Sequence, residues 1–117
     1  MRLIGLDIGD ARTGIAISDE LGITARPLET IDTGRLSARL TSLLSEHPGA
    51  KVVVGRPRSL DGSLGQQAVR IEEIASELEV PVVYEDETAT TAEAGPGSTD
   101  ADAACVMLQG YLDEPQP

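Results

Sequence analysis

The stretch Leu3–Gly9, LIGLDIG, decides how the rest of the chain folds. It places one carboxylate, Asp7, inside an otherwise apolar segment of strand length, and Thr13–Ser18, TGIAIS, follows as a second such segment. The polar residues between them predict a turn, so we expect the chain to open with two neighbouring strands. A carboxylate in a buried strand loses its hydration unless a metal, a cation or hydrogen-bond donors compensate it. Asp7 is therefore the first candidate for a functional residue.

The composition limits the classes of protein to which the chain can belong. Its 117 residues suffice for one domain, which we expect at 1–112, followed by a flexible tail at 113–117. Twenty acidic against nine basic residues give a net charge of -11, which taken alone disfavours a partner with a phosphate backbone. The single Cys excludes an internal disulfide, and no segment has the length of a membrane span. We expect a cytoplasmic protein, either a monomer or a homodimer.

The spacing of apolar residues predicts the remaining elements. Pro27 restricts a third strand at 24–31 to a sheet edge or an irregular stretch, and leucines at helical spacing predict a helix at 35–46. A strand at 51–55, a helix around 71–78, a strand from 81 to 87 and a last helix ending near 112 follow. Ser98 or Thr99 is expected to cap that last helix. This order predicts an α/β protein with a mixed five-stranded sheet flanked by helices, the element order of a ribonuclease H-like fold.

Acidic residues recur where strands end and where the last helix begins. Asp86 and Glu87 end the last strand, and Asp100 lies in the first turn of the final helix. Strand alternation sends Asp86 and Glu87 to opposite faces, so only one of them can join Asp7 directly. Carboxylates brought together repel one another unless divalent cations neutralise them, so the set predicts a Mg²⁺ or Mn²⁺ site able to hydrolyse phosphodiesters. For Asp100 alone, a first-turn acid stabilised by the helix dipole is an equal alternative.

Three arginines are the main candidate contacts to phosphate, with Arg70 as an additional one. Arg56 and Arg58 lie in the predicted loop after the strand at 51–55, and Arg12 lies in the turn between the first two strands. Arginine suits phosphate because its guanidinium binds two oxygens at once, although solvated loop arginines remain the alternative. The glycines between 5 and 14 also allow the phosphate-binding hairpin of ATPase-like domains. The chain has no G-x-G-x-x-G or G-K-[ST] element, which makes dinucleotide and P-loop sites weak interpretations.

Several motifs in order resemble the YqgF-type (RuvX) family, whose members are Holliday junction resolvases also described as pre-16S rRNA nucleases. The motifs are GLDIG at 5–9, RTGIAISD at 12–19, VVGRP at 53–57, DETATT at 86–91 and DADAA at 100–104. The resemblance implies a ribonuclease H-like fold and Mg²⁺-dependent cleavage of structured nucleic acid. It implies a role in maturing the 5′ end of 16S rRNA during ribosome biogenesis, with Holliday junction resolution in DNA recombination as the alternative. It places the catalytic, metal-binding acids on Asp7, Glu87 (with Asp86 beside it) and Asp100.

Three features depart from the pattern of that family. Thr88 stands where the family has an arginine, and Arg56 stands where its strand-end loop has an apolar residue. The segment between Ala94 and Asp100 is shorter than the helical, basic segment of the family. Fewer basic residues weaken binding to a phosphate backbone. A domain that binds nucleic acid without cleaving it is therefore a further alternative.

Overall fold

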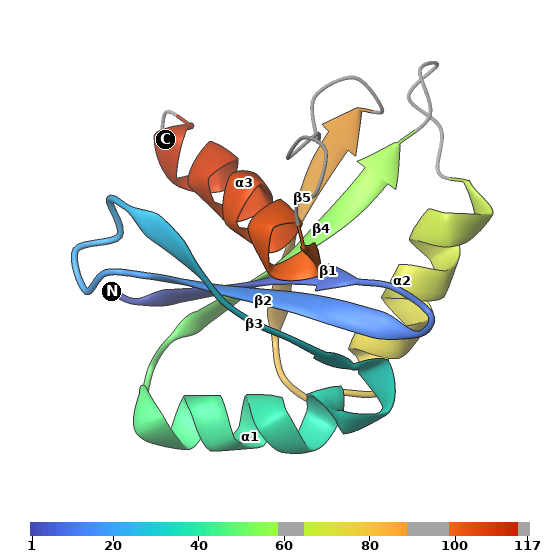
Figure 1. Cartoon of the computed structure of the whole chain (residues 1–117), viewed down its shortest axis with the longest axis horizontal. Coiled ribbons are helices and arrows are strands. Elements are labelled where there is room, and N and C mark those ends of the chain that lie inside the picture. The colour runs from blue at the N-terminus through green and yellow to red at the C-terminus, as the bar shows by residue number, and fades with distance from the viewer. Residues whose placement is uncertain (59–64, 89–98, 115–117) are drawn as a thin grey trace.

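The structure, a computed structural model, describes residues 1–58, 65–88 and 99–114. Five strands form one sheet in the order β3-β2-β1-β4-β5, with β2 antiparallel to both neighbours and β1, β4 and β5 parallel. The strands are β1 (Leu3–Ile8), β2 (Arg12–Ser18), β3 (Ala25–Asp32), β4 (Lys51–Arg58) and β5 (Val82–Thr88). The helices are α1 (Leu36–Glu46), α2 (Gln66–Ser76) and α3 (Asp100–Asp113), with a 3-10 turn at Thr33–Arg35. Helix α3 covers one face of the sheet, and α1 lies on the other (Figure 1). The expected mixed five-stranded sheet is confirmed.

Strand β1 separates two apolar layers through its alternating side chains. Ile4, Leu6 and Ile8 are almost completely buried in the larger layer, against α1 and α2. Leu3 faces the smaller layer, which it shares with Ala16 and with residues of α3. A register slip of one residue would exchange the two layers, so burial on both faces fixes the pairing of this central strand. Asp7 shares the face of Leu3 and therefore lies on the side of α3.

Helix α3 approaches the sheet closely because two strand positions beneath it lack a Cβ atom. A Cβ on Gly5 would lie 2.9 Å from the Cβ of Leu108. A Cβ on Gly14 would lie only 1.8 Å from the carbonyl oxygen of Asp100. A glycine inside a strand often marks such a close approach of another backbone. These two glycines therefore set how near the start of α3 comes to the end of β1.

A capping box starts helix α3. The hydroxyl of Thr99 accepts a hydrogen bond from the N–H of Asp102 (3.1 Å), and the carboxylate of Asp102 accepts one from the N–H of Thr99 (2.9 Å). The box satisfies two backbone donors that the helix itself leaves unpaired. The cap expected at Ser98 or Thr99 is confirmed at Thr99, and Asp102 is occupied in this structural role.

Thr99→Ala is expected to lower the free energy of unfolding by about 1 kcal/mol, the usual effect of losing an N-cap side chain. Hydrogen bonds from the backbone N–H of Thr99 and, after it, from its hydroxyl hold the pKa of Asp102 below its usual value, and the variant loses only the second of these. That stabilisation is present above the unfolded pKa and is lost as the pH falls through the native pKa, so the deficit of the variant should shrink in acid. Urea unfolding at neutral and acidic pH measures both effects, with Thr99→Ser as the control that keeps the hydroxyl. Equal stability of Thr99→Ala and the wild type at neutral pH would contradict the role of the box.

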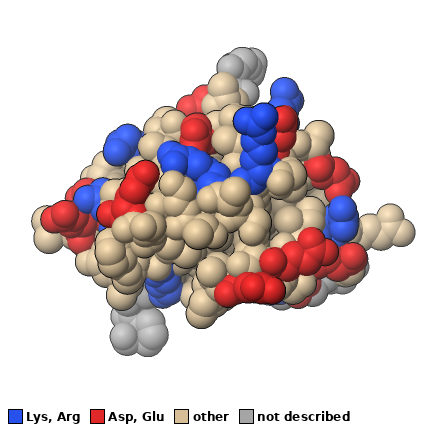
Figure 2. All heavy atoms as spheres, turned by 90° about the horizontal axis from the view of Figure 1, so that it is seen from below, with Lys and Arg blue, Asp and Glu red and all other residues tan. Residues whose placement is uncertain are grey.

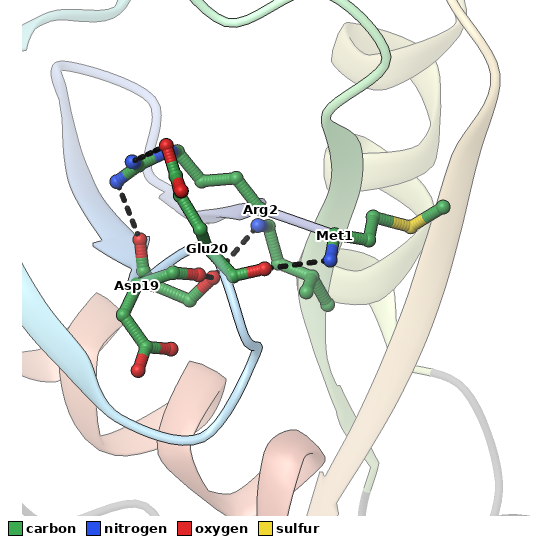
Figure 3. A network of polar contacts seen from close by, with 6 residues as sticks. Met1, Arg2, Asp19 and Glu20 are labelled. Carbon is green, nitrogen blue, oxygen red and sulfur yellow. Dashed lines mark hydrogen bonds and ion pairs between the residues drawn. The ribbon is translucent and has the colours of Figure 1, made fainter.

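The first residues of the chain are tied to the turn between β2 and β3 (Figure 3). The amino group of Met1 donates a hydrogen bond to the carbonyl of Glu20 (2.6 Å). The guanidinium of Arg2 donates to the carbonyl of Ser18 (3.0 Å) and lies 3.4 Å from the Glu20 carboxylate. Asp19 closes the turn by accepting hydrogen bonds from two backbone N–H groups. These contacts fix the end of the sheet that lies away from Asp7.

The expected and observed boundaries differ mainly at α2, which was expected around 71–78 and spans Gln66–Ser76, and at β4. Pro27 lies in β3, and β3 is an edge strand as expected. Strand β4, however, continues past residue 55 to Arg58, so the loop predicted to carry Arg56 and Arg58 is wrong. The last β1–β4 pair is Leu6 with Val54, so beyond it β4 pairs with β5 alone and tolerates Pro57. Among the residues that the structure describes, no helix has the length and apolar character needed to cross a membrane.

Candidate functional site

Asp7 and Asp100 meet where β1 ends beneath the start of α3. Gly14 is the ladder partner of Asp7, and the backbone of Asp100 rests against this glycine. Burial, and after it the negative charge of Asp100, raise the pKa of Asp7 above its usual value. Both side chains are half-buried. The fold therefore brings the two carboxylates near each other, and the charge of Asp100 opposes ionisation of Asp7.

A cavity of about 400 Å³ opens beside Asp100 and is lined by Arg12, Thr30, Thr99 and Asp100. The Nε atom of Arg12 lies 3.4 Å from the Asp100 carboxylate, and 69% of the Arg12 side chain is exposed. The hydroxyl of Thr30 accepts a hydrogen bond from the N–H of Ala101 (3.0 Å) and so ties the first turn of α3 to β3. A solvent-facing cation thus stands at the mouth of the cavity, within reach of an anionic substrate.

Asp86 lies with Arg56 rather than with Asp7. The guanidinium of Arg56 donates to both carboxylate oxygens of Asp86, at 2.7 and 3.2 Å, and lies 3.5 Å from the Glu72 carboxylate. It also lies over the ring of Tyr84, 4.7 Å from the centroid. Arg56 and Asp86 are ladder partners on the face covered by α2. The structure therefore does not bring either of these two candidates to the Asp7–Asp100 pair.

Glu87 and Arg58 are placed here by their backbones alone. Glu87 pairs with Pro57, and Arg58 pairs with Thr88, at the ends of β5 and β4. The side chains of Glu87 and Arg58 lie outside the described residues. Because neighbouring strand positions belong to opposite faces, the position of Glu87 is on the face of α3, opposite to that of Asp86. Glu87 therefore remains the hypothesis for a third carboxylate.

The chemistry of Asp7 and Asp100 fits a divalent cation. Carboxylate oxygens are the hard donors that Mg²⁺ and Mn²⁺ prefer. The raised pKa of Asp7 shows that its ionisation is opposed in the protein alone, and a cation beside it would favour the charged form. Among the side chains that the structure describes, which do not include that of Glu87, no three metal-ligating groups cluster. The described part of the chain thus contributes a pair of ligands.

Two parts of this arrangement were missed in the sequence. The sequence indicates a hairpin glycine at Gly14, although an isolated glycine within a strand also signals the close approach of another backbone. Thr30 carries no signal in the sequence, because its role depends on a partner 71 positions away in the chain. Both residues position α3 rather than contact a ligand through a charge.

Comparisons with known proteins identify relatives that are named as nucleases. The profile of the RuvX family, described as Holliday junction resolvase, matches residues 1–114. A relative from Lachnospira eligens is named "Putative pre-16S rRNA nuclease". It is 37% identical over an alignment of 139 positions, gaps included, which covers 99% of this chain and 99% of the relative. A relative of the same name from Shouchella clausii is 40% identical over 135 residues, covering 97% of this chain and 95% of the relative. The solved structure of T. thermophilus RuvC in complex with a Holliday junction substrate matches with a TM-score of 0.54 at 19% identity, covering 96% of this chain and 93% of that chain.

These comparisons bear on the fold class and on the length of the chain. RuvC has a ribonuclease H-like fold, so the likeness confirms the expected fold class. The alignment with the Lachnospira eligens relative runs over 139 positions, although the chain has only 117 residues. The relative therefore carries residues that this chain lacks.

Proposed function

The chain belongs to the RuvX family of nucleases, and from this premise we propose that it is a divalent-metal-dependent nuclease acting on structured nucleic acid. Its proposed substrate is the 5′ end of precursor 16S rRNA, and its proposed place of action is the cytoplasm. The observation that carries the proposal is the interaction of Asp7 with Asp100, which itself lines an open cavity. The names of the relatives support the RNA substrate.

In this proposal each residue has a separate task. Asp7 and Asp100, with Glu87 as the third carboxylate, hold the metal. Bound Mg²⁺ or Mn²⁺ supplies activation of water and stabilisation of the leaving oxygen. Arg12 turns its exposed guanidinium from Asp100 toward a phosphate of the substrate and orients the strand. Arg58, the last residue of β4, is the proposed second contact to phosphate.

A four-way DNA junction is the second candidate substrate. The observation that favours it is the description of the family profile, Holliday junction resolvase, over residues 1–114. The same carboxylate pair would serve this reaction, because both substrates present phosphodiester bonds. The two candidates differ in the nucleic acid that must fit the surface around the cavity.

The test compares cleavage of precursor 16S rRNA and of a four-way DNA junction, each in Mg²⁺ and in excess chelator. We expect the RNA to acquire a new 5′ end in Mg²⁺ and to stay intact in chelator. Unchanged cleavage in chelator contradicts the metal dependence. Cleavage of the junction without cleavage of the RNA would contradict the RNA substrate and identify the DNA junction as the substrate. Binding of RNA with no cleavage in either Mg²⁺ or Mn²⁺ contradicts the nuclease proposal and identifies a binding domain.

A further inference from the structure

A groove lies behind the candidate site, on the face of the sheet opposite to Asp7. Two cavities of about 400 and 350 Å³ adjoin there and share the lining residues Asp10, Arg70 and Ile74. One extends to the start of α2 at Gln66, and the other extends to the start of α1. In Figure 1 the β1–β2 turn, α2 and the start of α1 converge on the right of the molecule. The two cavities therefore form one groove beneath the turn that follows Asp7.

The walls of the groove combine an apolar floor with a polar rim. Ile8, Ile71 and Ile74 form the floor of the larger cavity. The exposed amides of Gln66 and Gln67 stand at its rim. Each amide offers both hydrogen-bond donors and an acceptor, which is the pattern needed to bind the edge of a planar heterocycle. The larger cavity thus combines apolar side chains with polar groups that can hydrogen-bond to an occupant.

The charges of the groove favour an uncharged occupant over a phosphate. Arg70 is the one basic residue among the described residues that line it, and its Nε donates to the Asp10 carboxylate at 3.0 Å. The same guanidinium lies 3.7 Å from Glu73, and Glu77 adds a further carboxylate to the lining. The face seen from below carries acidic side chains among basic ones rather than a continuous basic track (Figure 2). A phosphate backbone would therefore be repelled where a base would be tolerated.

We propose that this groove receives an unpaired nucleobase of the substrate strand next to the cleavage position. The inference rests on the proposed nuclease function and defines its substrate class as nucleic acid that is single-stranded or bulged beside the cut. Asp10 follows Asp7 by three residues, so at the rise of a strand the mouth of the groove lies within about 10 Å of Asp7. Glutamine amides bind base edges through two hydrogen bonds, and a carboxylate such as Asp10 accepts one from an exocyclic amine. A base that stays paired and stacked in a continuous duplex does not present its free edge to such a groove.

The test measures binding without cleavage, with the full chain in excess chelator. The substrate carries 2-aminopurine, a fluorescent base analogue, at the unpaired position beside the mapped cut. We expect its fluorescence to rise on binding, because the base leaves its stacked neighbours for an aliphatic pocket. Gln67→Trp, which fills the rim, should weaken binding at least about fivefold. Val69→Trp is the matched control on the same helix, at a position that is 48% exposed and outside the groove lining, and it should bind as the wild type does.

A second variant and a second readout make the outcomes separable. The double variant Gln66→Ala with Gln67→Ala removes the amides without adding bulk and should weaken binding in the same direction. Wild-type affinity in both groove variants, with unchanged fluorescence, overturns the inference, while Mg²⁺-dependent cleavage by the same variants upholds the proposed function. Equal weakening by Val69→Trp also overturns the inference, since the effect would then not belong to the groove. Absence of binding and cleavage in the wild type overturns both.

Discussion

Asp7→Asn is expected to lower the rate of Mg²⁺-dependent cleavage by about 1,000-fold, which corresponds to about 4 kcal/mol of transition-state stabilisation. The substitution keeps the shape of the side chain but removes one of the two carboxylates that meet beneath α3. A neutral amide holds a divalent cation far less tightly than a carboxylate. Single-turnover cleavage at saturating Mg²⁺ gives the rate. Asp113→Asn, the same change at the exposed far end of α3, is the control and should leave the rate unchanged.

The same substitution is expected to stabilise the protein when metal is absent. Burial and the charge of Asp100 raise the pKa of Asp7, so its ionised form destabilises the fold. That penalty is present above the raised native pKa and disappears as the pH falls below the unfolded value of about 3.9. In chelator at pH 7, Asp7→Asn should therefore unfold at a higher temperature than the wild type, and at pH 3 the two should coincide. Mg²⁺ should raise the Tm of the wild type and not that of the variant. A lower Tm of the variant in chelator at pH 7 would contradict the pairing of Asp7 with Asp100.

The fold could be predicted where one strand or helix carries its own pattern. Alternation in Leu3–Ile8 identifies a central strand buried on both faces, and Pro27 correctly marks an edge. The end of β4 could not be predicted in the same way. Pro57 disfavours a strand with neighbours on both sides, but β1 has already stopped pairing there and β5 alone continues to Thr88. The extent of β4 thus depends on where two other strands end.

The candidate site could be predicted only in part, for a related reason. Asp7 stands out because a carboxylate in an apolar strand needs compensation. Its position near Asp100 depends on contacts between distant segments, chiefly the packing of the start of α3 against Gly14. The pairing of Arg56 with Asp86 depends on the register of two parallel strands, which no local pattern specifies. Residue types therefore indicate the candidates, and the packing decides which of them meet.

Gly14→Ala is expected to have the largest effect on structure, lowering the free energy of unfolding by about 3 kcal/mol. The new methyl group would lie 1.8 Å from the carbonyl oxygen of Asp100 and 2.7 Å from the nitrogen of Ala101. Both atoms belong to backbone, so the clash cannot be relieved by rotating a side chain. The start of α3 must move away from β2, and Asp100 must move away from Asp7 with it. Urea unfolding measures the loss of stability, and cleavage in Mg²⁺ measures the loss of activity.

Gly110→Ala separates this effect from a general response to replacing glycine. Gly110 is exposed within α3, and a Cβ there would meet no atom within 4 Å. Because alanine restricts the unfolded chain and favours helix, this variant should gain about 0.5–1 kcal/mol and keep its activity. Both substitutions add a methyl group, Gly110→Ala in α3 and Gly14→Ala in the strand beneath it. Changes of opposite sign in the free energy of unfolding would therefore identify the contact between helix and sheet as the cause. Wild-type stability and Mg²⁺-dependent cleavage in Gly14→Ala would mean that α3 does not rest on β2, and Asp100 would then lose its place beside Asp7.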